Sequence, residues 1–211
     1  MKVLLGTTNP SKVRRFSELM GGYGIEFFTL NDLGIDTEPD ECGKTPEENA
    51  VIKAKFYGKY FDRVICNDSG LYFDSLPFDD PHQPGLNIRA PQGVRLDDEA
   101  MIAYYSELVA SLGGKTLAYY LDGIAVYNCG NVSSYMEISE TTKASAFYMV
   151  DQPTEARHVG WPLDSISINR NTNLYFTDKN NNKFDTTNEN IMLGEYRKRI
   201  RAFMAESLGI L

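Results

Sequence analysis

Cysteine, histidine and tryptophan are scarce in this chain, which limits the chemistry it can perform. Its 211 residues include three cysteines, two histidines and one tryptophan. The cysteines form no CxxC pair and their number is odd, so we expect reduced, mostly structural thiols. Because no Gly-x-Ser-x-Gly motif occurs and no cysteine has an obvious base beside it in sequence, the chain does not fit a protease or an esterase.

Positive charge and long apolar runs are also lacking. The formal net charge is −8, whereas proteins that bind long nucleic acids rely on basic surface to release counterions. No segment approaches the ~20 apolar residues that span a membrane, and polar residues interrupt the N-terminal apolar run too early for a secretory signal. We therefore expect a soluble cytoplasmic protein without a nucleic-acid or membrane partner. A small anion could still bind to a local cluster of cations.

Strand and helix patterns alternate in the first half of the chain. Apolar runs predict strands at residues 2–5, 25–30, 63–67 and 71–76. Amphipathic spacing and capping residues predict helices at residues 11–20, 45–61, 96–112 and 188–211, the last with a potential interruption at Gly194. Residues 115–150, rich in β-branched and aromatic side chains, favour antiparallel strands.

This order favours an α/β fold with a mixed, twisted sheet, flanking helices and a ligand cleft beside the strand ends, between two lobes. Length alone does not decide between one domain and two. We take residues 1–211 as a single domain. The proline-rich residues 77–95 are expected to form an irregular loop, and the Asn-rich residues 169–190 a loop or hairpin rather than a linker.

The segment "GTTNPSK" at residues 6–12 has the composition of an anion-binding loop. It lacks the second glycine and the Ser or Thr after lysine that a P-loop requires, so it is not a Walker A motif. Thr7, Thr8 and Asn9 still offer side-chain donors, the following helix offers free N–H groups, and Lys12 offers a cation. The alternative is an ordinary N-cap loop with a solvated lysine.

The second helix places further charged groups near the same region. Thr45 and Glu48 form a capping box. Asn49 and Lys53, four residues apart, share one face of that helix, although most helix lysines are simply solvated. Glu41 lies in the loop before it.

The stretch "CNDSGL" places Asp68 at the end of the next strand. Taken alone, Asp-Ser-Gly is a tight turn. A strand–loop–helix–strand unit could nevertheless bring Glu41 and Asp68 to one cleft with Lys12 and Lys53. Mg²⁺ is usually held by one or two carboxylates plus substrate phosphates, so this combination fits a nucleoside triphosphate.

Four ordered segments make the interpretation specific: "LLGTTNPSKVRRFSELM", "TEPDECGKTPEENAVIKAK", "NDSGLYFDSL" and "PGLNIRA". In this order they resemble the inosine triphosphate pyrophosphatase family, closely over about the first ninety residues and loosely thereafter. The resemblance implies an elongated two-lobed α/β fold around a nucleotide cleft, a homodimer, and hydrolysis of deaminated purine nucleoside triphosphates to monophosphate and pyrophosphate.

The resemblance also implies roles for individual residues. The triphosphate would be held by Thr7, Thr8, Asn9, Lys12 and Lys53, with backbone N–H groups at Ser69 and Gly70. Glu41 and Asp68 would coordinate Mg²⁺, and Asp68 would also orient or deprotonate the attacking water. Many relatives have another acidic residue at the position of Asn67.

Base recognition is where the chain departs from the family. "GWPLDS" replaces the family's "GFGYDP", so Trp161 could stack on the base and Asp164 keep the acidic role; a core position for Trp161 is the alternative. The family's C-terminal Ser-His-Arg corresponds to Arg197-Lys198-Arg199, which leaves Lys198 and Arg199 as candidate base contacts, or else a solvated helix face. The altered loop "PGLNIRA" leaves Arg89 as its basic residue.

The sequence therefore predicts an Mg²⁺-dependent nucleoside triphosphate pyrophosphohydrolase with (d)ITP- and XTP-type substrates. Two alternatives remain open. The altered base-recognition residues could select a different modified or ordinary nucleotide, or the chain could bind nucleotides without turning them over.

Overall fold

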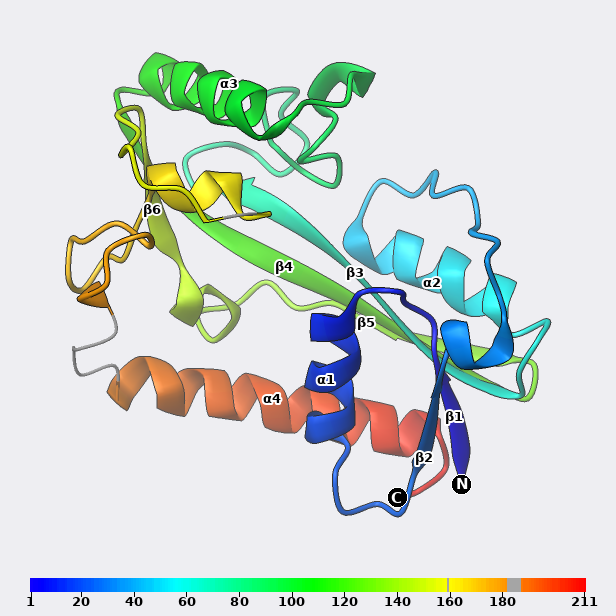
Figure 1. The fold of residues 1–211 in the computed structure, drawn as a ribbon. Coiled ribbons are helices and arrows are strands. Elements are labelled where there is room, and N and C mark those ends of the chain that lie inside the picture. Colours follow the sequence, from blue (N-terminus) through cyan, green and yellow to red (C-terminus); the bar gives the residue numbers. More distant parts are fainter. Residues whose placement is uncertain (159, 182–186) are drawn as a thin grey trace. The chain divides into compact units, whose positions relative to one another are not determined.

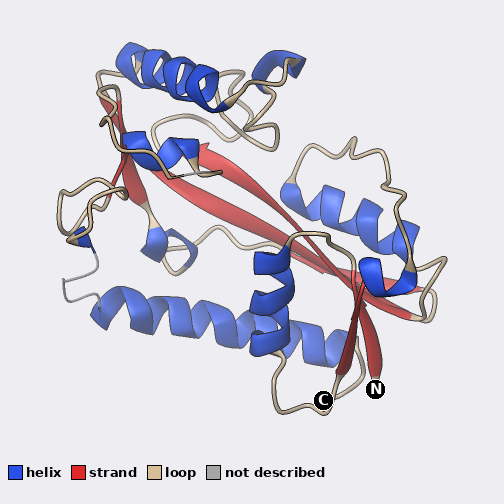
Figure 2. Ribbon diagram, viewed as in Figure 1, coloured by secondary structure: helices blue, strands red, loops and turns tan. Residues whose placement is uncertain are grey.

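The computed structural model describes residues 1–158, 160–181 and 187–211. Figures 1 and 2 show the helices and strands of these residues. The strands are β1 (Lys2–Leu5), β2 (Glu26–Thr29), β3 (Arg63–Phe73), β4 (Lys115–Asn128), β5 (Asn131–Tyr135), β6 (Phe147–Val150) and β7 (Ser167–Ile168). The α-helices are α1 (Pro10–Leu19), α2 (Pro46–Tyr57), α3 (Asp98–Ser111) and α4 (Thr187–Ser207). Short 3₁₀ turns are η1 (Asn31–Leu33), η2 (Pro91–Gly93), η3 (Thr142–Ser145) and η4 (Pro162–Ile166).

The strands form one mixed sheet in the order β2-β1-β3-β4-β6-β7, with β5 paired to β4. β1 pairs in parallel with β2 and β3, whereas β4 pairs antiparallel with β5 and β6, and β6 with β7. The expected α/β class with a mixed sheet is therefore confirmed. Parallel pairing comes from the strand–helix alternation of the first residues, and antiparallel pairing from the strand-rich middle.

The chain divides into two compact units. The first comprises residues 1–69, 121–141 and 193–211, and the second residues 70–120 and 142–192. The assignment of residues 1–211 to one domain, and the cleft expected with it, stay predictions. Part of the Asn-rich segment at 169–190, residues 182–186, lies outside the described residues.

The first unit has helices on both faces of its strands. Alternate residues of β1, β3 and β4 point to opposite faces because the side-chain period of a strand is two. On one face, Val3, Ile65 and Ile124 pack with Phe16 of α1 and Ile200 of α4. The opposite face packs against α2 through a second cluster of buried residues: Leu4, Ala50, Ala54, Tyr57, Val64, Cys66 and Ala125. Ala50, Ala54 and Tyr57 thus form the apolar stripe with which α2 packs on the sheet.

In the second unit, α3 and η4 cover strand residues from one side. Tyr105 and Val109 of α3 are fully buried and belong to one cluster with Phe73, Met149 and residues of η4. Asp97 caps α3 by accepting a hydrogen bond from the N–H of Ala100 at 2.8 Å. Acidic residues in the first turn of this helix add a favourable interaction with the helix dipole.

Two expectations about local structure were wrong. Residues 67–70 do not form a tight turn, because β3 runs unbroken from Arg63 to Phe73. Strand partners and side-chain hydrogen bonds to β4 outweigh the turn preference of Asp-Ser-Gly. Likewise α4 is continuous through Gly194, since packing of its apolar face compensates for the low helix propensity of glycine.

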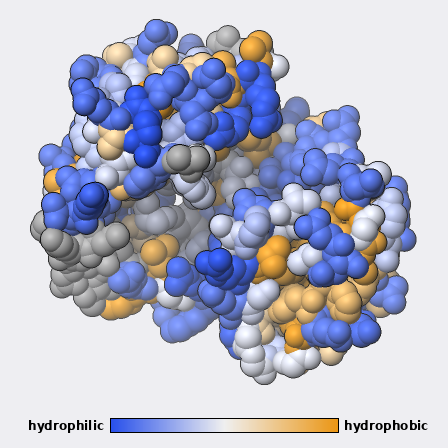
Figure 3. Space-filling model, viewed as in Figure 1, coloured by the Kyte–Doolittle hydropathy of each residue, from blue (hydrophilic) through white to orange (hydrophobic). Residues whose placement is uncertain are grey.

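The surface is largely hydrophilic on the face that Figure 3 shows, as the acidic composition leads one to expect. Of the helices described, none has the length and apolar character needed to cross a membrane. All three cysteines are free thiols, with Cys66 buried and Cys42 and Cys129 exposed. Burial raises the pKa of the Cys66 thiol to about 12, which makes it a structural residue rather than a nucleophile.

Candidate active site

Asp68 lies on β3, where the alternation of side chains decides what it faces. Val64 and Cys66, which have the same parity, pack toward α2, so Asp68 also points to that helix. Asn67 and Ser69 share the parity of Ile65 and point to the opposite face, the one covered by α1 and α4. One strand therefore presents a carboxylate to α2 and two polar side chains to the other side.

The predicted carboxylates and Lys53 lie together. Nζ of Lys53 is 2.9 Å from Oδ1 of Asp68 and 2.8 Å from Oε2 of Glu41. Asn49, one turn before Lys53, donates its side-chain N–H to Oδ2 of Asp68 at 3.1 Å. The i, i+4 relation between Asn49 and Lys53 thus aims both side chains at the same carboxylate.

Lys53 keeps its charge at this position. Burial by itself would lower the pKa of Lys53, but the charges and hydrogen bonds of Asp68 and Glu41 outweigh burial and raise it. Lys12 differs: burial and the nearby charge of Lys53 together lower its pKa despite the attraction of Asp68. Its Nζ is 3.5 Å from the backbone oxygen of Asn67. Two ammonium groups that repel one another favour an anion between them.

The start of α1 stands beside these groups. Asn9 is the N-cap of the helix, and its Oδ1 accepts hydrogen bonds from the N–H groups of Ser11 and Lys12 at 2.9 and 3.4 Å. Thr7 Oγ1 accepts from the N–H of Asn9 at 3.1 Å, and Thr8 is exposed. The loop is therefore an N-cap loop in its local structure, and this does not conflict with a phosphate-binding role because Asn9 and Thr8 remain exposed.

The start of α2 is fixed by its N-cap residue, Thr45, and by Gly123 of β4, which packs against the backbone of the first turn. Thr45 Oγ1 accepts from the N–H of Glu48 at 3.1 Å, as the capping box predicts, while Glu48 Oε2 accepts from the N–H of Lys44 rather than that of Thr45. A Cβ added to Gly123 would lie 2.1 Å from the backbone nitrogen of Glu47. Glycine is therefore required at position 123, and it holds α2 firmly in place relative to the strand.

The donor set suits a hard divalent cation that also binds phosphate. No group of three or more His, Cys, Asp or Glu side chains arranged for a metal occurs in the described part of the chain. Glu41 and Asp68, however, both reach the same ammonium group within 3 Å, so their oxygens converge on one place. Two carboxylates leave further coordination positions to substrate oxygens, which is how a hard divalent cation is usually held on a phosphate substrate.

Sequence reasoning missed Asp122 on β4. Its Oδ1 accepts hydrogen bonds from Ser69 Oγ at 2.7 Å and Asn67 Nδ2 at 3.2 Å, and its Oδ2 lies 2.6 Å from the guanidinium of Arg15 on α1. A lone acidic residue within the apolar strand pattern "YYLDGIAVY" was the available signal. Such a residue is rarely buried without a partner.

The base-contact candidates of the second unit lie on its surface. Trp161 is 63% exposed, so the alternative of a core position is wrong. Asp164 Oδ2 is 2.8 Å from Nδ1 of His158, and Arg89 is 2.8 Å from Asp98. Gly70 lies in the part of β3 that belongs to this unit. Their roles toward a base or phosphate stay predictions.

The candidates on α4 have carboxylate partners. Lys198 is an exposed residue paired with Glu195 at 2.6 Å. Arg199 holds Glu137 with two nitrogens, at 2.8 and 3.0 Å. Burial alone would raise the pKa of Glu137, but hydrogen bonds from Arg199 and neighbouring hydroxyls lower it to about 2. The assignment of Lys198 and Arg199 to the base remains a prediction that would require these pairs to open.

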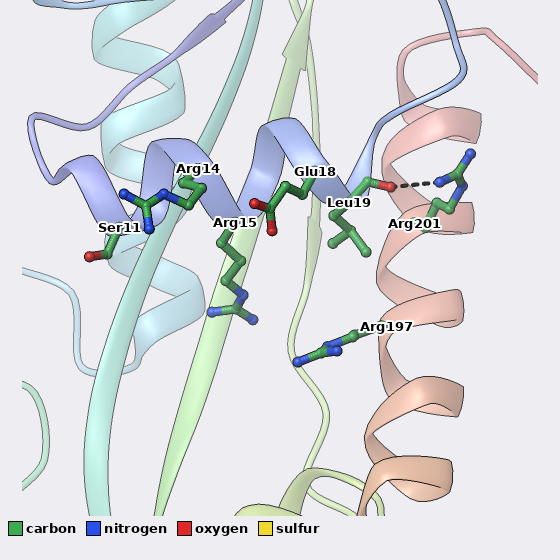
Figure 4. Close-up of a pocket in the computed structure, with 7 residues that line it drawn as sticks. All are labelled: Ser11, Arg14, Arg15, Glu18, Leu19, Arg197 and Arg201. Carbon is green, nitrogen blue, oxygen red and sulfur yellow. Dashed lines mark hydrogen bonds between the residues drawn. The ribbon is translucent and has the colours of Figure 1, made fainter.

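Arg197 has a different environment, which the sequence did not single out. It lines a pocket of about 530 Å³ beside α1, and Figure 4 shows its guanidinium projecting from α4 toward the side of α1 that carries Arg15. Arg201 lines the same pocket and donates to the backbone oxygens of Leu19 and Gly21 at 2.9 and 2.8 Å. Residues 197 and 201 thus face α1, and residue 199 faces Glu137, because side chains four apart share a helix face.

Known proteins resemble this chain in sequence and in fold. Proteins named dITP/XTP pyrophosphatase are 40% identical over 87 residues in Thermoanaerobacter pseudethanolicus, covering 41% of this chain and 42% of that protein. In Bacillus subtilis strain 168 the match is 35% identical over 102 residues, 48% of this chain and 50% of that protein. The chain thus spans about half the length of these curated relatives.

Solved structures extend the likeness over nearly the whole chain at low identity. The Staphylococcus aureus Ham1 protein has a TM-score of 0.66 at 18% identity, covering 96% of this chain and 99% of that one. A HAM1 protein from Coxiella burnetii has a TM-score of 0.69 at 18% identity, covering 98% and 99%. These two structures support the fold alone. Residues 3–163 match the Ham1 family, and together with the named relatives this match confirms the family resemblance seen in the sequence. The chain belongs to the Ham1 family.

Proposed function

We propose that this chain is a metal-dependent nucleoside triphosphate pyrophosphohydrolase. Its substrates would be deaminated purine nucleotides of the dITP and XTP type, and its products the nucleoside monophosphate and pyrophosphate. The observation that carries the proposal is the convergence of Glu41, Asp68 and Lys53 within 3 Å contacts, beside Lys12. Relatives named dITP/XTP pyrophosphatase support the same reaction and substrate class.

A divalent cation, Mg²⁺ in this proposal, would be held by the carboxylates of Glu41 and Asp68. When bound, it would neutralise phosphate charge and polarise the phosphoryl oxygens. Lys53 balances both carboxylates in the described structure. If the carboxylates held a cation, the ammonium group of Lys53 would be released to pair with the triphosphate.

The remaining chemistry belongs to the chain's own residues. Lys12 and the N–H groups at the start of α1 would hold the phosphates through charge and hydrogen bonds. Asp68 would orient the attacking water and accept its proton. The water oxygen bonds to the α-phosphorus, and the bond from that phosphorus to the bridging oxygen breaks. Pyrophosphate would leave with its charge balanced by Lys12 and Lys53, so positioning and electrostatics would supply most of the catalysis.

The deciding experiment is a panel of purine and pyrimidine nucleoside triphosphates, scored for pyrophosphate rather than phosphate. We expect dITP and XTP to be preferred. Preference for another nucleotide would mean that the departures at Arg89, Trp161 and residues 197–199 have changed base selection. Tight binding of nucleotides without pyrophosphate release would mean that the chain is a binding protein.

Asp68→Asn tests the assignment of the central carboxylate. The amide can neither hold the cation strongly nor accept a proton, so we expect turnover to fall below detection while the unfolding transition stays close to that of the unsubstituted chain. Pyrophosphate release within a factor of about two of the unsubstituted rate would remove Asp68 from the chemistry.

Two further properties belong to the proposal. The family resemblance implies a homodimer, and size-exclusion chromatography with light scattering would test it by mass. A cytoplasmic location is proposed from the composition, and cell fractionation would test it.

A further inference from the structure

Asn67 is a buried amide surrounded by oxygen atoms. It is 4% exposed, and its Nδ2 lies 2.9 Å from the backbone oxygen of Asp68, 3.2 Å from Asp122 Oδ1 and 3.1 Å from the backbone oxygen of Gly123. All three neighbours are acceptors. A donor is therefore required at this point, and a carboxylate in its place would meet three lone-pair groups without a proton to share.

Asp122 joins this amide to Ser69 and to α1. One of its oxygens accepts from both Asn67 and Ser69, and the other pairs with Arg15 at 2.6 Å. The Asp122 side chain is 14% exposed and that of Arg15 41%. Burial alone would raise the pKa of Asp122, but Arg15 and the hydrogen bonds from Ser69 and Asn67 outweigh it and lower the pKa. The carboxylate is therefore charged at neutral pH and accepts on both sides.

The contacts of Asp122 fall on the two neighbours of Asp68. Asn67 and Ser69 flank Asp68 in β3, and the Asn67 amide also binds the backbone oxygen of Asp68 itself. Because side chains alternate along a strand, this network lies on the α1 face while the Asp68 carboxylate meets Lys53 and Asn49 on the α2 face. Fixing both neighbours fixes the direction in which Asp68 projects.

We propose that Asp122 is a positioning residue for Asp68, and that Asn67 and Asp122 form a matched amide–carboxylate pair in which neither member can be exchanged alone. This inference rests on the proposed function, in which Asp68 holds the cation and accepts the proton of the attacking water. In this inference, Asp122 acts through Asn67 and Ser69 and does not contact the substrate. A displacement of about 1 Å at a reacting group can cost about 100-fold in rate, so loss of this support should be visible in turnover.

The test uses the chain of 211 residues and four variants: Asp122→Asn, Asn67→Asp, the two combined, and Glu99→Gln. Glu99 pairs with Arg157 at 2.7 Å in the second unit, so Glu99→Gln removes a carboxylate–guanidinium pair that is not part of the hydrogen-bond network of Asp122. The kcat and KM for pyrophosphate release from dITP are measured for each. Mn²⁺ affinity in the presence of a non-hydrolysable dITP analogue, by electron paramagnetic resonance, gives a readout that does not depend on turnover.

We expect Asp122→Asn to lower kcat about 10- to 100-fold, with KM changed by less than about threefold and weaker Mn²⁺ binding. Asn67→Asp alone should also lower kcat. The loss of kcat in the combined variant should be smaller than the product of the two single losses by about fivefold or more, since contacting residues couple in this range. Glu99→Gln should match the unsubstituted chain.

Two results would contradict the inference. Unchanged kcat and Mn²⁺ affinity in folded Asp122→Asn would overturn the positioning role, and additive losses in the combined variant would overturn the matched pair. If Asp122→Asn does not fold, Arg15→Gln loosens Asp122 from the exposed side. Its kcat should then fall by about threefold or more, and an unchanged kcat contradicts the proposal. Absence of pyrophosphate release from the unsubstituted chain would instead refute the proposed function, and Mn²⁺ affinity would still decide the positioning role.

Discussion

At the scale of single residues, Lys53 is held between two carboxylates. Its ammonium group balances Asp68 and Glu41 at the same time, and its side chain is 15% exposed. A partly buried cation between two carboxylates stabilises both charges, and removal of the cation leaves them facing one another. In the proposed function, the ammonium group of Lys53 would pair with the triphosphate once a metal ion is held by the two carboxylates.

Lys53→Ala should therefore weaken triphosphate binding. We expect the KM for dITP to rise about tenfold or more, because a charge-assisted hydrogen bond to phosphate is lost. Lys55→Ala is the matched control, since Lys55 is an exposed lysine on the same helix. Steady-state kinetics of the two variants make the comparison, and equal kinetic constants for both would exclude Lys53 from the site.

The cysteines give a second prediction at this scale. Cys66 is buried with its pKa raised to about 12 by desolvation, whereas Cys42 and Cys129 are exposed. A thiolate is the reactive form, so iodoacetamide should label two cysteines in the native protein and all three in denaturant. Intact-mass spectrometry counts the labels. Rapid labelling of Cys66 under native conditions would show that its side chain is accessible after all.

At the scale of elements, β3 and α4 show how packing overrides local preference. Asp-Ser-Gly in β3 has the composition of a turn, yet residues 63–73 remain extended. β1 pairs with Val64 and Ile65 at the start of β3, and β4 is the neighbouring strand on the other side. Asp122 and Gly123 of β4 supply partners for the polar side chain of Asn67. Gly194 in α4 is likewise kept helical by the packed residues Tyr196 and Ile200 that follow it.

Gly194→Ala should stabilise the protein. No heavy atom lies within 4 Å of a Cβ built at this position, so alanine gains helix propensity of about 1 kcal/mol without a clash. The urea midpoint should rise while activity stays unchanged. Gly123→Ala is the contrasting variant: its Cβ would overlap the backbone of α2, and it should lower the midpoint strongly. A lower midpoint for Gly194→Ala would mean that this turn of α4 is not helical in solution.

At the scale of the whole molecule, an acidic chain concentrates cations where an anion is expected. The net charge is −8, yet Lys12 near the start of α1 is close enough to Lys53 for the two charges to interact. Arg14, Arg15, Arg197 and Arg201 line the pocket between α1 and α4. Negative charge elsewhere favours solubility, while local cations attract phosphates. Such a distribution suits a small anionic substrate and disfavours a long nucleic acid.

The acid limit of global stability should depend on Glu137. The pKa of Glu137 is about 2 in the folded protein, below its ordinary value of 4.5. The ionised Glu137 therefore stabilises the fold fully above pH 4.5, and this stabilisation is lost as the pH falls from 4.5 toward 2. Between these two pH values, the urea midpoint of Glu137→Gln should fall less steeply than that of the unsubstituted chain. At neutral pH the variant should be less stable than the unsubstituted chain. Glu107→Gln, an exposed position on α3, is the control. Identical slopes for both variants would contradict the prediction.

Sequence alone determined the features that depend on local pattern. Periodicity and caps predicted the helices near residues 10, 46, 98 and 187, and the succession of helices and strands along the chain predicted a mixed sheet. Ordered motifs predicted the family, and residue types at fixed separations predicted that Glu41, Lys53 and Asp68 would meet. These predictions succeeded because helical spacing, strand alternation and short connections constrain where such side chains lie.

The tertiary structure alone decided the features that depend on distant segments. Asp122 is 55 residues from Asn67 in sequence, yet the two side chains share a hydrogen bond. It also decided that Arg197 faces α1 while Arg199 binds Glu137, and that Trp161 lies on the surface. No local pattern encodes such approaches, because they depend on which strands become neighbours and on the rotation with which each helix packs.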